Sequence, residues 1–266
     1  MTTASEPHID LRTQMRPGGS VAVLTLSNPT RLNAIGPAMM ADFIDKAVEL
    51  SDDEDLRAVI VTGAGERAFA GGVDIREMAK IEGPKAARAF ITQVHRVCAA
   101  VRAIPVPVIA RVQGHCYGGA LELIAACDLR IAATDARFGM PEVRLGIPSV
   151  VEAALLPMLI GWGRTRRLLY TGETIDAHKA LAWGLVEDVA APEALDLAVE
   201  ACLADIFACG PTAIRQQKAL MQAWERLPLA EAVQAGVDAF AEAYRGDEPR
   251  TMMAEFLAAR AARKQR

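Results

Sequence analysis

The sequence contains no long apolar run, no signal-like leader and no paired metal ligands, and each absence excludes a class of protein. Its most apolar stretch, residues 153–163, is short and interrupted by Pro157, so it cannot span a bilayer. Residues 1–12 carry acids and lack the apolar core of a signal peptide. The four histidines show no HExxH or other paired spacing, which leaves a metal site unsupported. We therefore expect a soluble, cytoplasmic protein with no metal and no membrane partner.

The chain also lacks an excess of positive charge and any close pair of cysteines. Its formal net charge is −4 over 266 residues, which gives no electrostatic footprint for nucleic-acid binding. The cysteines number five, an odd count, and form no CxxC pair, which is typical of reduced core cysteines in a cytosolic protein. We expect no nucleic-acid partner and no disulfide framework.

Two common catalytic signatures are missing, and one cofactor signature is out of place. The sequence has no GxxxxGK[ST] and no GxSxG, which removes the P-loop and α/β-hydrolase patterns. Residues 63–68 match GxGxxA after a strand-like run, as in a dinucleotide-binding fold. However, the segment 69–72 (FAGG) follows where the phosphate-binding helix should run. We therefore expect neither a nicotinamide nor a flavin cofactor.

Hydrophobic periodicity predicts alternating strands and helices in the first half of the chain and mostly helices in the second. This order favours an α/β core over residues 1–200 and a helical region for oligomerisation over residues 201–266. The predicted strands are 21–26, 57–62, 106–112, 129–132 and 185–189. The predicted helices are 37–50, 84–101, 119–126, 152–160, 176–182, 192–208, 211–225, 229–244 and 249–263.

Two glycine-rich segments are the most informative feature that is present. Residues 68–74 (AFAGGVD) and 114–122 (GHCYGGALE) each follow a strand-like run and lead into a helical pattern. Glycine at such a junction lets the backbone approach a ligand and turn its N–H groups toward it. Two such loops that converge would supply a pair of donors for one carbonyl oxygen, an oxyanion hole. The pattern indicates an enzyme of acyl transfer or enolate chemistry.

Carboxylates near these loops are candidates for acid–base work. Glu122 lies in an otherwise apolar helix, where an ionisable group is costly unless it is paired or useful; a buried glutamate bonded to a loop is the alternative. Glu142 follows Pro141, a pair that also begins ordinary helices. Two carboxylates across one water can act as general base and general acid. Glu152 is a third candidate, although a glutamate at the start of a helix often only interacts favourably with the helix dipole. His115 lies within the second glycine loop.

These segments, in this order, resemble the enoyl-CoA hydratase/isomerase (crotonase) family over nearly the whole chain. The resemblance is carried by residues 24–29, 31–34, 68–75, 114–122, 127–130, 138–148, 170–173 and 182–186. It implies a spiral of ββα repeats with a C-terminal helical region that forms a homotrimer or, as a dimer of trimers, a homohexamer. It also implies an acyl-CoA substrate, with coenzyme A as part of the substrate and no further cofactor.

The resemblance assigns roles to particular positions. It implies that the backbone N–H groups of Val73 and Gly119 hold the thioester oxygen, and that Glu122 and Glu142 are the catalytic pair. Arg31, Arg76 and Lys218 match basic positions that serve coenzyme A. The remaining positions matched to substrate binding are Ala68, Ala70, Gly72, Asp74, Ile75, Gly118, Pro141 and Leu145.

Both glutamate positions of a hydratase are filled, so the resemblance implies syn addition of water across a 2-trans-enoyl-CoA double bond. The sequence departs from the hydratase pattern after residues 145–146. The usual loop there is longer and rich in glycine, whereas this chain reads IPSVVE over residues 147–152. The glutamate pair also suits an enoyl-CoA isomerase or an acyl-CoA hydrolase or lyase. A catalytically silent protein that binds coenzyme A esters is a further alternative.

Overall fold

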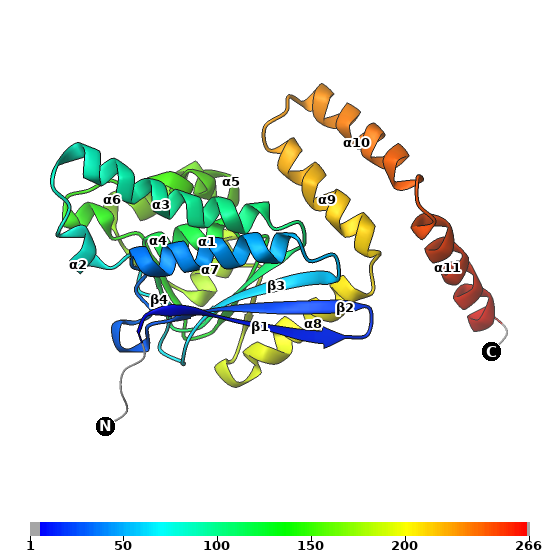
Figure 1. Ribbon diagram of the computed structural model, residues 1–266, viewed down its shortest axis with the longest axis horizontal. Helices are drawn as coiled ribbons and strands as arrows, with labels where there is room; N and C mark the ends of the chain where they lie inside the picture. Colours follow the sequence, from blue (N-terminus) through cyan, green and yellow to red (C-terminus); the bar gives the residue numbers. More distant parts are fainter. Residues whose placement is uncertain (1–5, 265–266) are drawn as a thin grey trace.

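The computed structural model describes residues 6–264, which form two sheets and a set of covering helices (Figure 1). The larger sheet has the order β1-β2-β3-β5-β7-β10 and is parallel except for the hairpin of β1 with β2. Its strands are β1 (His8–Arg16), β2 (Gly19–Ser27), β3 (Leu56–Gly63), β5 (Val108–Val112), β7 (Leu129–Ala133) and β10 (Asp188–Ala190). The smaller sheet contains β4 (Ala68–Ala70), β6 (His115–Tyr117), β8 (Arg137–Gly139) and β9 (Thr174–Asp176).

The two sheets are built from the same repeating unit. The successive pairs β3–β4, β5–β6 and β7–β8 each place their first strand in the larger sheet and their second in the smaller one. Helical segments follow each pair: α2 (Ile75–Met78) and α3 (Gly83–Ala103), then α4 (Gly119–Ala126), then the 3₁₀ turn η2 (Glu142–Leu145). The predicted spiral of ββα repeats is therefore confirmed.

The main hydrophobic core lies between the sheets and the helices α1 (Pro37–Ser51), α3 and α4. Every residue of β3 and of α4 is buried, as their mostly apolar sequences predict. A second apolar cluster joins the larger sheet to α8 (Leu195–Phe207) through Leu195, Val199 and Leu203. The predicted domain boundary at residue 200 falls inside α8, and it stays a prediction.

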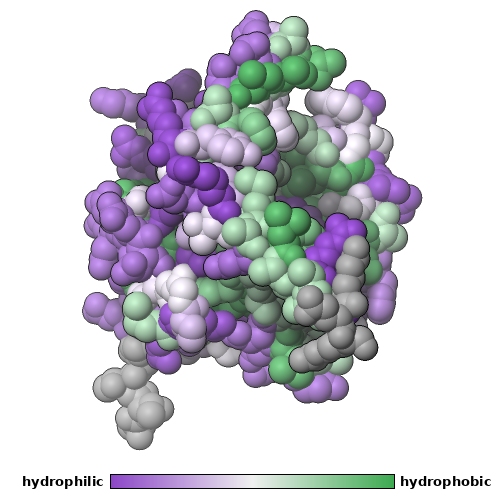
Figure 2. Space-filling view, turned by 90° about the vertical axis from the view of Figure 1, so that its right-hand side faces the viewer, coloured by the Kyte–Doolittle hydropathy of each residue, from purple (hydrophilic) through white to green (hydrophobic). Residues whose placement is uncertain are grey.

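The C-terminal helices extend away from the body. These are α9 (Pro211–Trp224), α10 (Leu229–Ala243) and α11 (Glu248–Lys264), at the right of Figure 1. Large apolar side chains are exposed along α10 and α11, among them Leu229, Val233, Val237, Phe240, Phe256 and Leu257. Figure 2 shows this side of the molecule, and at its upper end, where α10 lies in Figure 1, a band of hydrophobic side chains lies beside hydrophilic ones. The predicted helical C-terminal region is confirmed, while its role in trimer formation stays a prediction.

Some predicted elements differ in extent from those of the structure. The predicted helix 152–160 starts as the 3₁₀ segment η3 (Val151–Leu155) and continues as α5 (Leu156–Ile160), and the predicted strand 185–189 is reduced to β10. Strand β1, the strands of the smaller sheet, and α6 (Trp162–Thr171) were not expected from periodicity. The described elements not yet named are α7 (Ala177–Trp183), η1 (Pro29–Arg31) and η4 (Pro192–Ala194).

Over residues 6–264 no single helix is long and apolar enough to cross a membrane. One bent pair, residues 192–207 with 211–224, passes a test of length and composition only when the two helices are taken together across a 103° break.

Candidate active site

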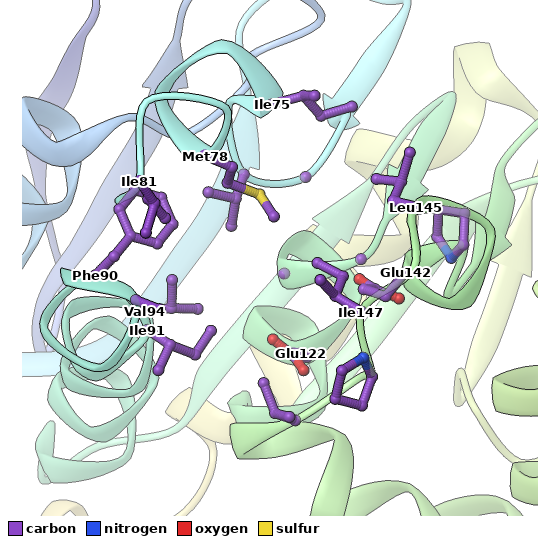
Figure 3. Close-up of a pocket in the computed structure, with 18 of the residues that line it drawn as sticks. Ile75, Met78, Ile81, Phe90, Ile91, Val94, Glu122, Glu142, Leu145 and Ile147 are labelled. Atoms are coloured by element: carbon purple, nitrogen blue, oxygen red, sulfur yellow. The ribbon is translucent and has the colours of Figure 1, made fainter. Parts of the chain in front are cut away.

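A cavity of about 500 Å³ opens where the two glycine loops meet the segment 141–150 and the helices α2 and α3 (Figure 3). On one side it is lined by Gly72, Val73, Gly118 and Gly119. Apolar side chains from α3 and from the 141–150 segment form most of the remaining wall. The cavity therefore combines a polar backbone edge with an apolar interior, as ligand sites commonly do.

The two glycine loops lie on adjacent parallel strands, which brings Val73 and Gly119 together. Strand β4 pairs with β6 with Ala70 opposite Cys116, and Val73 and Gly119 each follow three residues later. No side chain separates the loops at Gly72, where φ is +102° and an added Cβ would lie 2.8 Å from the Tyr117 carbonyl oxygen and 3.9 Å from the Gly119 nitrogen. Only glycine permits this close approach of the two backbones.

The N–H groups of Val73 and Gly119 are available as donors. A parallel bridge to Ile35 uses the groups beside Val73: the Ile35 N–H donates to the Gly72 carbonyl at 2.9 Å and the Asp74 N–H donates to the Ile35 carbonyl at 3.0 Å. Gly119 begins α4, and the first N–H groups of a helix have no partner within it. Among residues 6–264, no backbone carbonyl accepts a hydrogen bond from the N–H of Val73 or Gly119. Two free donors therefore lie at one edge of the cavity.

Glu122 lies one turn into α4, and its carboxyl group faces the cavity while the residue is only 3% exposed. Burial, and after it the negative charges of Glu142 and Glu152, raise the pKa of this carboxyl to about 8. The nearby backbone N–H groups of Val150 and Ala153 partly oppose the rise in pKa. Glu122 therefore holds a proton more tightly than an ordinary glutamate, which suits a group that exchanges a proton with substrate.

Glu142 is the second carboxylate of the cavity. It is the first residue of η2, and the Ser149 hydroxyl donates a hydrogen bond to its Oε2 at 2.8 Å. Its Oε1 lies so close to the second glycine loop that a Cβ on Gly118, where φ is +54°, would overlap it. Figure 3 shows the carboxyl groups of Glu122 and Glu142 turned toward the same part of the cavity. The structure thus brings together the two glutamates that the sequence indicated.

The predicted substrate-binding residues divide into two groups. Gly72, Ile75, Gly118, Pro141 and Leu145 line the cavity. The other predicted residues are outside the lining: Ala68, Ala70, Asp74, Arg31 and Arg76.

Most of the predicted binding residues outside the cavity lining are held by packing or by hydrogen bonds within the fold. Ala68 and Ala70 are buried in β4, and Asp74 caps α2 by accepting the Arg76 N–H at 2.9 Å. Arg31 donates to Asp74 at 3.0 Å, and the Arg76 side chain is exposed. Their roles in binding stay predictions.

Lys218 and His115 lie away from the cavity. The ammonium group of Lys218 is buried and donates to the Val106 carbonyl at 2.8 Å and to Asp128 at 2.7 Å, in a separate cavity beside α9. The ring of His115 stacks on Tyr117. Within one chain, both side chains have structural contacts and neither reaches the site.

The sequence did not indicate the apolar wall of the cavity. This wall includes Met78, Ile81, Phe90, Ile91, Val94, Ile147 and Val150 (Figure 3). The amphipathic pattern of α3 was visible, but the pattern does not say which part of an apolar face covers the core and which part borders a cavity. In the described part of the chain, no group of three or more histidine, cysteine, aspartate or glutamate side chains is arranged to hold a metal ion.

Comparisons with known proteins identify the family of this chain. Residues 16–264 match the family model for enoyl-CoA hydratase/isomerase. The crotonyl-CoA hydratase of Syntrophomonas wolfei is 35% identical over 243 residues, covering 91% of this chain and 93% of the relative. The short-chain-enoyl-CoA hydratase of Clostridium acetobutylicum is 34% identical over 243 residues, covering 90% and 92%.

Solved structures show the same fold. The enoyl-CoA hydratase of Mycobacterium smegmatis superposes with a TM-score of 0.89 at 30% identity, covering 94% of this chain and 96% of that one. The enoyl-CoA hydratase of Bacillus anthracis gives a TM-score of 0.88 at 29% identity, again covering 94% and 96%. With the family model matched over most of its length, this chain belongs to the enoyl-CoA hydratase/isomerase family.

Proposed function

We propose that this protein is an enoyl-CoA hydratase that adds water across the double bond of a 2-trans-enoyl-CoA thioester. The observation that carries the proposal is the pair Glu122 and Glu142, both facing one cavity beside two free backbone donors. The N–H groups of Val73 and Gly119 would hold the thioester oxygen, which gains negative charge in the enolate-like transition state. The N-terminus of α4 adds its dipole at the same place. Coenzyme A is part of the substrate, and no further cofactor is required.

Hydration needs one group that takes a proton from water and one that delivers a proton to the α-carbon. Two neighbouring carboxyl groups serve this purpose when they share one proton, and their mutual repulsion favours that state. The ionised carboxyl group accepts a proton from water as the water oxygen bonds to the β-carbon. The protonated carboxyl group of the pair gives its proton to the α-carbon from the same side, which gives syn addition. The proton belongs to the coupled pair, so the two roles are assigned to the pair.

The test uses purified protein with crotonyl-CoA and longer 2-enoyl-CoAs, followed by loss of the absorbance of the conjugated thioester. We expect turnover of at least one chain length, and a fall of about 10²–10⁴-fold for Glu122→Gln and for Glu142→Gln. Glu200→Gln is the matched control, because Glu200 pairs with Arg16 outside the cavity. No turnover on any chain length would refute the proposal. Full activity of Glu142→Gln would refute the two-carboxylate mechanism.

A double-bond isomerase is the second candidate, favoured by the segment 147–152. Ile147 and Val150 place apolar side chains in the cavity wall, and the loop that carries them is shorter and bulkier than the glycine-rich loop of the usual hydratase pattern. A drier site suits proton transfer between two carbons better than addition of water. Migration of the double bond in a 3-enoyl-CoA, without hydration of the 2-enoyl isomer, would support the isomerase. Hydrolysis of an acyl-CoA would indicate a hydrolase, and binding of acyl-CoA without turnover a silent binding protein.

We also propose a homotrimer or homohexamer in the cytoplasm. The exposed apolar side chains of α10 and α11 support the assembly, since a contiguous apolar surface of this kind usually meets another chain. The five free cysteines fit a reducing compartment. Light scattering coupled to size exclusion tests the assembly, and a monomeric mass would contradict it.

A further inference from the structure

Glu152 is a buried carboxylate behind the cavity that the proposed reaction does not use. It lies in η3, which packs against both α3 and α4, and the residue is 8% exposed. The Nδ1 of His95, on α3, lies 2.7 Å from its Oε1. Within residues 6–264 its Oε2 is buried and has no hydrogen-bond partner. A buried carboxylate with an unused oxygen is costly, so its presence calls for a reason beyond packing.

The turn that carries Glu152 also shapes the surroundings of Glu122. The segment packs against α4, the backbone N–H groups of Val150 and Ala153 act on the Glu122 carboxylate from nearby, and the Val150 side chain lines the cavity. Between them Val151 has φ of +38°, a left-handed conformation that a β-branched residue rarely adopts. The surrounding contacts must hold this strained turn, and the contact of Glu152 with His95 ties it to α3.

We propose that Glu152, held by His95, is a positioning residue for Glu122. It fixes the strained turn that packs against α4 beside Glu122, and it adds a third negative charge near the Glu122 carboxylate. The kinetic part of this inference rests on the proposed hydratase function. The structural part concerns only the protonation of Glu122.

The charged and titratable groups around this cluster give the expected sign. Glu122 faces Glu142 from η2, Glu152 from η3, and the thiol of Cys98 from α3. Burial first, then the charges of Glu152 and Glu122, raise the pKa of the Cys98 thiol well above its ordinary value, so it stays neutral. The adjoining helix α5 (LPMLI) carries no titratable side chain. Loss of the Glu152 charge must therefore lower the pKa of Glu122.

The direction is the same whether Glu122 acts as the acid or the base. If Glu122 must be ionised, the rising limb of the pH profile of kcat/KM reports its pKa; if it must be protonated, the falling limb does. In either role the limb moves to lower pH when the neighbouring charge is removed. A residue that only supports the fold would change the amount of active enzyme and leave the limb in place.

The test compares the wild-type chain with Glu152→Gln, which keeps the size of the side chain and removes its charge. Carbon-13 NMR of labelled glutamate carboxyl carbons follows the titration of Glu122, assigned by the resonance lost in Glu122→Gln. We expect the Glu122 midpoint and the matching limb of kcat/KM to move together to lower pH. Glu225→Gln is the matched control: Glu225 pairs with Arg102 on the same helix α3, and its charge is not among those acting on Glu122. This control is expected to leave both midpoint and limb unchanged.

An unmoved Glu122 midpoint in a folded Glu152→Gln variant would overturn the inference. A midpoint that moves while the limb of kcat/KM stays in place would overturn the positioning role in the reaction. If Glu152→Gln does not fold, the test uses Glu152→Met instead, which removes the same charge at a similar side-chain volume. The NMR midpoint does not depend on turnover, so an inactive wild-type protein counts against the proposed function, and a fixed midpoint counts against this inference alone.

Discussion

Replacing Glu122 by glutamine should stabilise the protein while removing its activity. The Glu122 carboxyl has its pKa raised from 4.5 to about 8 in the folded chain, mainly by burial. A folded-state pKa above the unfolded one means that the folded state holds its proton more tightly than the unfolded state. The contribution of Glu122 to stability is therefore greatest below pH 4.5 and is lost as pH rises toward 8. Glutamine does not titrate, so the stability of Glu122→Gln does not fall with pH for this reason.

The magnitude follows from the pKa difference. Each pH unit between the two pKa values changes the free energy of unfolding by about 1.4 kcal/mol. Between pH 5 and pH 8 the wild type should lose ~3 kcal/mol relative to Glu122→Gln. Groups that titrate alike in both proteins cancel from this difference.

Urea unfolding of both proteins at fixed concentration, from pH 5 to pH 8, measures the gap directly. A fixed concentration matters because the stability of an assembly depends on the concentration of its chains. The gap should widen steadily with pH in favour of Glu122→Gln. A gap that is constant over this range, or that narrows with pH, would refute the raised pKa of Glu122 and the acid–base argument based on it.

Three further changes test other parts of the structure. Gly118→Ala puts a Cβ onto Glu142 Oε1 at a positive φ, so turnover should fall by about 100-fold, measured as kcat on an active enoyl-CoA. Lys218→Met breaks the ion pair with the partly exposed Asp128, so the free energy of unfolding in urea should fall by about 1–2 kcal/mol. KM should stay unchanged, and a raised KM would support a role for Lys218 in binding coenzyme A. Phe256→Glu, on exposed α11, should lower the mass seen by sedimentation, and an unchanged mass would place the assembly surface elsewhere.

The sequence predicted the centre of the site better than its walls. The glycine loops have a local signal, because a buried strand, a glycine pair and an apolar helix follow one another in the chain. Glu122 was visible for the same reason, as one charge in an apolar helix. The apolar wall formed by Phe90, Ile91 and Val94 has no such signal, because only tertiary packing decides which residues of α3 border the cavity.

The fold was predicted in its class and in most of its long elements. The strands of the smaller sheet span three residues each, too few for an alternating pattern, so periodicity did not reveal them. The contact of Glu152 with His95 was equally out of reach, since it joins residues 57 positions apart. The sequence made Glu152 a third acid–base candidate, with a dipole role at a helix start as the alternative, and the structure shows a buried pairing with His95 of α3.

The meeting of the two proposed oxyanion donors depends on the smaller sheet as well as on the loops. Val73 and Gly119 each lie three residues beyond Ala70 and Cys116, which are opposite each other on the neighbouring parallel strands β4 and β6. Successive repeats of the spiral therefore deliver one donor each to the same edge of the cavity. Side chains around the cavity can then change in evolution while the pairing of β4 with β6 keeps the two donors together.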